Sequence, residues 1–220
     1  MLLEKFKILL FIIMTGLSYF IISKLFFIPI QEYSMFESGM YYILNNFIFL
    51  LCLVGLSLLL FDSNKNLSYF YFLGLFLLTY ISTLMSIDLI LNWIFLYNLD
   101  YFWGFDKFPL VILYFLSIFL GVILWFNPIN NLFKTFVLIF FGFIIAFHVA
   151  LKDIETFTLK SIINFPGGNL IIIIWLSIIL IYLFKIFNIL NKKYILFVSK
   201  IYGSWLITIG IISAIFSLLY

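Results

Sequence analysis

The residues best suited to chemistry stand together in the segment "FHVALKDIETF", residues 147–157, which contains the only histidine of the chain. If this segment is helical, His148, Lys152 and Glu155 are spaced i, i+4 and i+7 and share one face, whereas Asp153 points away. Ionisable side chains inside a membrane are costly and often functional. An imidazole placed beside an ammonium and a carboxylate could bind a ligand or transfer a proton near neutral pH.

Other polar residues are expected at a similar depth, near the ends of neighbouring apolar segments. Together they form a candidate polar cluster that could border an outward-facing cavity. Its members are Lys24, Asn45, Asn46, Asp88, Asn92, His148, Lys152 and Glu155.

Several members of this cluster also have a purely structural interpretation. Lys24 lies five residues before Pro29, so its aliphatic stem can carry the ammonium to the membrane interface. We expect Lys24 to extend in this way. Asn45 and Asn46 are equally suited to polar contacts between helices.

The histidine segment has a structural interpretation as well. Lys152, Asp153 and Glu155 are expected to begin an aqueous loop. His148 then becomes a boundary residue that is neutral at pH 7 and hydrogen-bonded to a neighbouring helix or to residues 88–108. Desolvation and the like charge of Lys152 both disfavour its protonation.

The composition identifies the environment of these residues. Hydrophobic residues make up 66% of the 220 positions, charged residues only 10%, and the mean hydropathy is +1.29. Such a chain has too little polar surface to cover a water-soluble globule. We therefore expect it to lie in a lipid bilayer and to have lipids as partners. The basic residues are all lysines scattered along the chain, which argues against a nucleic-acid partner.

Most enzyme classes are disfavoured by the residues that are missing. The single cysteine, Cys52, excludes an intrachain disulfide, and one histidine without a nearby cysteine cannot supply a zinc site. The segment "FPGGNL", residues 165–170, lacks the pattern of a phosphate-binding loop and is predicted to be a turn. The segment "YGSWL", residues 202–206, falls short of a serine nucleophile motif. We therefore expect no cofactor and no catalytic residues.

A helix that spans a membrane needs about 20 mostly apolar residues. We therefore place the ends of the spans at charges, prolines and groups of Asn or Gly. The result is a single all-α domain over residues 1–220, a bundle of seven transmembrane helices with short loops. The predicted spans are residues 8–30, 40–61, 68–87, 109–126, 135–151, 169–190 and 201–220.

Orientation follows from the lysines, because positively charged residues are retained on the cytoplasmic side. If the N-terminus lies on that side, or on the matrix side of an organelle, eight of the twelve lysines lie on the same side as the N-terminus and four on the other. The membrane is then a bacterial or an organellar inner membrane. Residues 88–108 are rich in Trp, Tyr and Phe but are interrupted by charged and Asn residues. They are predicted to lie in the outer interface between spans three and four.

The last predicted span carries small residues along one stripe. Gly203, Gly210 and Ala214 are spaced i, i+7 and i+11, which lets another helix approach closely. The neighbour is a helix of the same bundle or a helix of a partner subunit, and the sequence leaves both open.

Two functions remain. The first is a non-enzymatic subunit that packs with other membrane proteins in a larger complex, favoured by short loops and by span centres that offer only Ser and Gly. The alternative is a small permease or channel with an outward-facing polar cavity around His148. Transporters usually bind their substrates near the bilayer midplane, and this favours the subunit.

Overall fold

The computed structural model describes residues 2–26, 28–61, 66–97, 108–126, 129–152, 163–188 and 192–219. Within these ranges every regular element is a helix, so the predicted all-α class is confirmed. The helices are α1 (Leu2–Phe26), the 3-10 turn η1 (Ile30–Glu32), α2 (Met35–Asn45), α3 (Phe47–Phe61), α4 (Asn66–Met85), α5 (Ile87–Leu96), α7 (Phe108–Trp125), α8 (Asn131–Lys152), α10 (Phe165–Asn188) and α11 (Lys192–Leu219).

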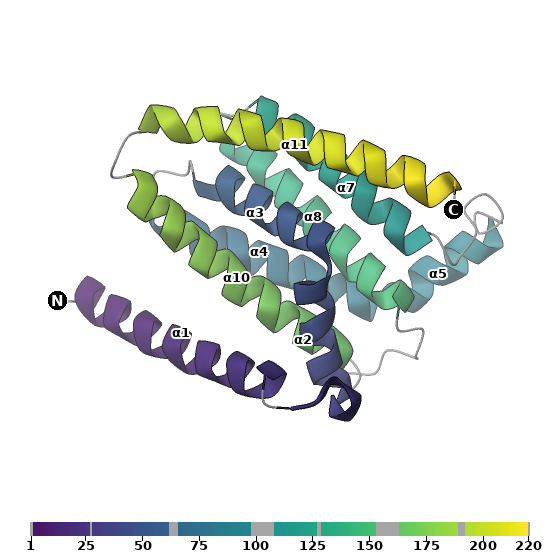
Figure 1. Ribbon diagram of the computed structural model, residues 1–220, viewed down its shortest axis with the longest axis horizontal. Coiled ribbons are helices and arrows are strands. Elements are labelled where there is room, and N and C mark those ends of the chain that lie inside the picture. The colour runs from purple at the N-terminus through teal and green to yellow at the C-terminus, as the bar shows by residue number, and fades with distance from the viewer. Residues whose placement is uncertain are drawn as a thin grey trace.

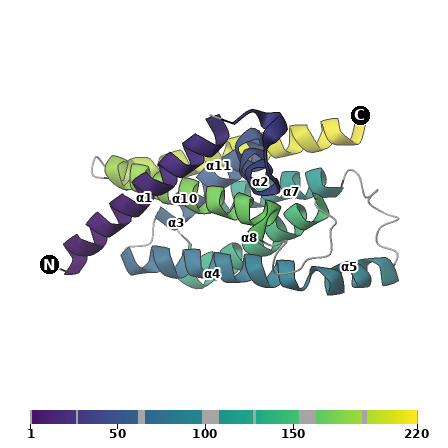
Figure 2. The same cartoon turned by 90° about the horizontal axis from the view of Figure 1, so that it is seen from below.

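The long helices lie side by side and α2 runs across them (Figure 1). The two ends of the chain lie at opposite ends of the bundle. Helix α3 occupies the centre, where residues 55–60 are all buried, and it packs against α7, α10 and α11. Seen from below, α4 and α5 form one edge of the molecule, far from α2 and from the C-terminal half of α11 (Figure 2).

The number of membrane crossings differs from the predicted seven. Among the described residues, three helices are long and apolar enough to cross a membrane: Asn131–Leu151, Phe165–Leu183 and Leu196–Ser217. The count rises to five if each of two bent helix pairs forms one span. The apolar stretches Ile12–Leu25 and Val111–Trp125 are helical but shorter. Each predicted range thus overlaps a helix, while the count of seven stays a prediction.

The predicted span 40–61 is wrong as a single helix, because the chain bends by 75° between α2 and α3. Asn46 lies at the break, where its backbone is extended, with φ −94° and ψ 99°. The backbone amide of Asn46 donates to Ile43 O at 3.3 Å. Its side-chain Oδ1 accepts from the backbone amide of Phe49 at 3.2 Å. One asparagine therefore ends α2 and caps the start of α3.

A second bend, of 60°, separates α4 from α5. Ser86 lies at this bend, and its hydroxyl donates to Ser82 O at 2.9 Å. Hydroxyls that bond back to the preceding turn loosen a helix and often bend it. The first part of the predicted interfacial segment 88–108 is helical and belongs to α5. Residues 98–107 lie outside the described ranges.

The segment "FPGGNL" is not the turn that its glycines predicted, because it forms the first turns of α10. A Cβ atom on Gly168 would overlap Phe36 O of α2, and one on Gly39 would overlap Phe165 O of α10. The two glycines are used for the close approach of two backbones, so α2 and α10 cross with their main chains nearly in contact.

The stripe of small residues on α11 also has its neighbour within the chain. Cβ atoms on Gly121 of α7 and Gly203 would each meet the other residue's carbonyl oxygen, at 2.6 and 2.7 Å, and Gly210 faces Tyr114 O of α7. The Ser117 hydroxyl donates to Leu206 O at 3.1 Å across the same contact. Helix α7 therefore occupies the Gly203 and Gly210 part of the stripe, and Ala214 is half-buried further along α11.

Candidate functional site

A groove of about 800 Å³ opens at the bend between α2 and α3. We call it the α2–α3 groove. Its walls come from the segment around η1, from α2 and the start of α3, and from α7, α10 and α11. The lining residues are Ile30, Tyr33, Met35, Ser38, Tyr41, Tyr42, Asn45, Asn46, Phe47, Ile48, Tyr114, Phe165, Ile209 and Ser213.

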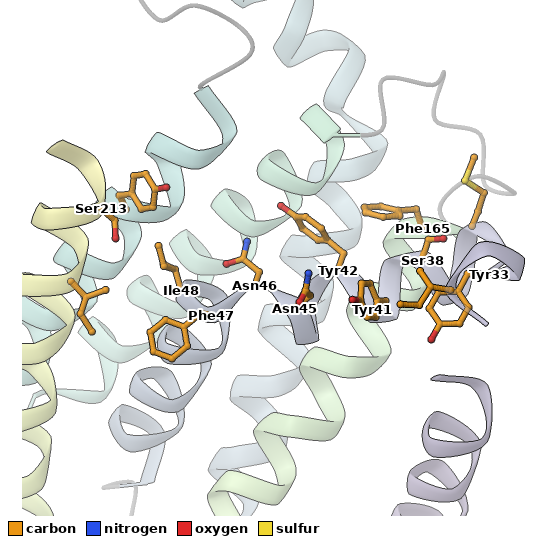
Figure 3. Close-up of a pocket in the computed structure, with 14 residues that line it drawn as sticks. Tyr33, Ser38, Tyr41, Tyr42, Asn45, Asn46, Phe47, Ile48, Phe165 and Ser213 are labelled. Atoms are coloured by element: carbon orange, nitrogen blue, oxygen red, sulfur yellow. The ribbon is translucent and has the colours of Figure 1, made fainter. Parts of the chain in front are cut away.

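The polar groups of the groove form a row. Figure 3 shows Asn46 and Asn45 in the middle of the row, with Ser213 of α11 at one end and Ser38 and Tyr33 at the other. None of the lining residues is charged. The groove therefore offers amide and hydroxyl groups for hydrogen bonds among aromatic and aliphatic side chains.

Helix α2 supplies most of this row because of its residue spacing. Ser38, Tyr41, Tyr42 and Asn45 are spaced i, i+3, i+4 and i+7 and share one helix face. The Asn46 break also leaves main-chain groups at the facing ends of α2 and α3 without partners inside their own helices, as every helix end does.

The groove is connected to the buried histidine through Tyr42. The Tyr42 hydroxyl lies 2.6 Å from Nε2 of His148, and Tyr42 also makes a side-chain hydrogen bond with Asn46. The Asn46 oxygen already accepts from the Phe49 amide, so we assign its amide group as the donor to Tyr42. The phenol can then donate to Nε2, which places the proton of a neutral imidazole on Nδ1.

His148 lies within an aromatic environment. It is fully buried, its ring stacks on Tyr42 with a centroid distance of 5.9 Å, and the Phe49 ring lies 6.1 Å away. The predicted contact with a neighbouring helix is therefore present, and the neighbour is α2. His148 itself does not line the groove.

An ion pair holds the end of α1 against the start of α2. Lys24 Nζ lies 2.9 Å from Glu37 Oε1, with 41% of the lysine side chain exposed and 8% of the glutamate. The Ser34 amide and hydroxyl both donate to Glu37 Oε2 at 2.8 Å, in a capping box. We expected Lys24 only to extend to the interface; instead it neutralises a buried carboxylate.

Tyr33 adds a second link between these two segments. Its hydroxyl donates to Leu25 O at 2.6 Å, and its ring meets Tyr41 edge to face at 5.8 Å. Burial raises the pKa of the Tyr33 phenol, and Tyr41 and Glu37 raise this pKa further. The phenol therefore remains a neutral donor at physiological pH.

The predicted polar cluster is only partly assembled in space. Asn45 and Asn46 line the groove, and His148 reaches it through Tyr42. Asp88 and Asn92 are exposed on α5 and are not lining residues. Lys152 ends α8, whereas its side chain and Glu155 lie outside what the structure describes.

Several residues of the site were missed by the sequence analysis. Ser38, Tyr41 and Tyr42 form the face of α2, Glu37 pairs with Lys24, and Gly39 allows the crossing with α10. The sequence does contain one signal for the groove. Ser38, Tyr41, Tyr42 and Asn45 recur at helical spacing within a single short segment. The apolar run that continues to residue 61 makes the same segment equally compatible with a single span.

In the described part of the chain, no group of three or more His, Cys, Asp or Glu residues could hold a metal ion. Comparisons of the chain with family models, with curated proteins and with solved structures found no match. The geometry of the groove is therefore the basis for any functional proposal.

Proposed function

We propose that this protein is a small permease or channel of a bacterial or organellar inner membrane. Its solute is uncharged and polar, and it binds in the α2–α3 groove. The observation that supports this proposal most directly is an open groove of about 800 Å³ whose lining includes two amides and several hydroxyls but no charged side chain. Pockets for small molecules usually measure roughly 300–1,000 Å³.

The broken helices support transport in particular. Discontinuous helices are a frequent source of binding groups in transporters, because the break frees main-chain donors and acceptors inside the protein. Here Asn46 separates α2 from α3 at the groove itself. A solute with hydroxyl or amide groups would find partners there, whereas an ion would lose its hydration without gaining an opposite charge.

The topology proposed with this function has seven crossings and a cytoplasmic or matrix N-terminus. The lysine distribution supports the orientation. An odd number of crossings also agrees with chain ends at opposite ends of the bundle (Figure 1). In this arrangement the groove lies toward the outer side, because α1 ends near the start of α2.

A second proposal keeps the chain as a non-enzymatic subunit of a larger membrane complex. Its support is the apolar surface of α11, whose candidate span is only 22% buried within the chain. Trp205 and Phe216 are exposed on this helix. The small-residue stripe gives less support than the sequence suggested, since α7 covers its Gly203 and Gly210. Stoichiometric co-purification with another membrane protein in mild detergent would favour this second function.

The permease proposal is tested by solute flux in liposomes. The purified chain is reconstituted into vesicles, and swelling in gradients of glycerol and of urea is followed by light scattering. We expect faster swelling than in protein-free vesicles with both solutes. Identical rates with and without protein would contradict the proposal.

A further inference from the structure

We infer that the α2–α3 groove recognises a carbohydrate, either a free sugar or the sugar headgroup of a glycolipid. This inference rests on the proposed function and names the chemical class of the molecule that binds in the same groove. It is carried by the side chains that surround the groove: aromatic faces, amides and hydroxyls occur together, without charges.

Aromatic side chains make up a larger share of the groove lining than of the whole chain. They make up 23% of the chain but six of the 14 lining residues, which are Tyr33, Tyr41, Tyr42, Phe47, Tyr114 and Phe165. The face of an aromatic ring carries partial negative charge. It therefore suits the C–H groups on the apolar face of a sugar ring, which are slightly positive.

The aromatic rings are also held in place by one another. Tyr33 and Tyr41 meet edge to face, and Tyr42 packs against Phe165 with a centroid distance of 5.6 Å. Tyr33 and Tyr42 are additionally fixed by hydrogen bonds to Leu25 and His148. Rings that are already ordered lose little entropy when a ligand stacks on them.

The polar groups match hydroxyls rather than ions. The Asn45 amide can donate and accept, and so can the hydroxyls of Ser38 and Ser213, as a sugar hydroxyl does. Two charged residues close to the groove, Lys24 of α1 and Glu37 of α2, do not line it. They form an ion pair and neutralise each other. A quaternary ammonium could bind the rings alone, but it would leave the amide and hydroxyl groups unused.

The test uses the full chain in nanodiscs of phosphatidylglycerol. In the first arm, maltose is titrated by calorimetry. In the second arm, glucosyl diacylglycerol is added to the nanodiscs, and its retention by the chain after detergent exchange is compared with that of diacylglycerol. Choline is the competing probe. Tyr41→Leu removes an aromatic face of the groove, Tyr41→Phe restores the ring, and Tyr194→Leu is the matched control because Tyr194 is exposed on α11 outside the groove.

We expect at least tenfold weaker sugar binding in Tyr41→Leu, and binding near the wild-type value in Tyr41→Phe and Tyr194→Leu. Maltose binding with this pattern supports a free sugar, and selective retention of the glycolipid with this pattern supports a headgroup. Choline binding in place of sugar, or no sugar binding in either arm, overturns the inference. Glycerol and urea flux, measured in liposomes reconstituted with the same purified chain, then decides separately whether the proposed permease function stands.

Discussion

Tyr42 and His148, 106 positions apart in the chain, are joined by a contact of 2.6 Å between the phenolic oxygen and Nε2. This contact links α2, which forms the groove, to the buried end of α8. It makes the only histidine a structural neighbour of the proposed solute site. The question for function is whether His148 supplies a hydrogen bond or a proton.

Paired substitutions of His148 separate these two roles. His148→Gln keeps a hydrogen-bonding partner for Tyr42, so we expect normal folding and normal solute flux. His148→Leu removes one hydrogen-bond partner of the half-buried Tyr42 phenol and should cost about 1 kcal/mol. Both variants are measured by thermal unfolding and by flux. If His148→Gln folds normally but carries no solute, the structural role is insufficient, because Gln cannot exchange a proton between pH 5 and 8.

The chain contains its own reporter of unfolding. Cys52 is the only cysteine, and its side chain is buried in α3 at 1% exposure. A fluorogenic maleimide should therefore react with the folded protein very slowly and with the unfolded protein rapidly. The temperature at which the signal rises gives Tm for each variant without an engineered cysteine.

The Lys24–Glu37 ion pair predicts a loss of stability in Lys24→Met. The substitution leaves a carboxylate with only 8% exposure without its cation, which should cost about 1–3 kcal/mol, or several degrees in Tm. The double variant Lys24→Met/Glu37→Gln should regain part of this loss, since Gln is uncharged. Lys200→Met is the control, because Lys200 is exposed on α11. An unchanged Tm in Lys24→Met would show that the pair is not stabilising.

The crossing of α2 and α10 predicts a strong effect of one methyl group. Gly39→Ala would place a Cβ atom against Phe165 O, whereas Gly74→Ala meets nothing within 4 Å. We expect Gly39→Ala to destabilise the protein by about 1–3 kcal/mol and Gly74→Ala to be neutral or slightly stabilising. Equal Tm values for the two variants would contradict the close backbone packing.

The proposed orientation is tested with an impermeant maleimide on intact spheroplasts. Glu32 and Asn130 are both exposed and are expected on opposite sides of the membrane. Glu32→Cys should be labelled from outside, and Asn130→Cys only after permeabilisation. The unmodified chain is the blank because Cys52 is buried. The reverse labelling pattern would invert the topology.

Helix positions were largely predictable from sequence because apolar runs and chain breakers act locally. Residues 109–126 correspond to α7 within one residue at each end. Pro109 and Pro166 each occupy the second position of a helix, where proline is well tolerated. The bend at Asn46 was not predicted, since an asparagine inside an apolar run is compatible with a continuous helix as well as with a break.

The candidate site was less predictable because its contacts join distant segments. The partner of His148 comes from α2 and the partner of Lys24 from the helix that follows α1, and neither pairing leaves a periodic signal in the chain. Asp88 and Asn92 were expected with the cluster because they share its depth, but the 60° bend places them on α5, away from the groove.

Conduction of an uncharged polar solute through the α2–α3 groove is tested by measuring the flux through two asparagine variants. Asn45 lines the groove and Asn92 is exposed on α5, so Asn45→Leu and Asn92→Leu make the same chemical change inside and outside the site. Loss of one hydrogen bond in a binding site costs about 1.5 kcal/mol, roughly tenfold. We expect glycerol flux to fall about tenfold in Asn45→Leu and to be unchanged in Asn92→Leu. Equal flux in the two variants, or wild-type flux no faster than in protein-free vesicles, would contradict it.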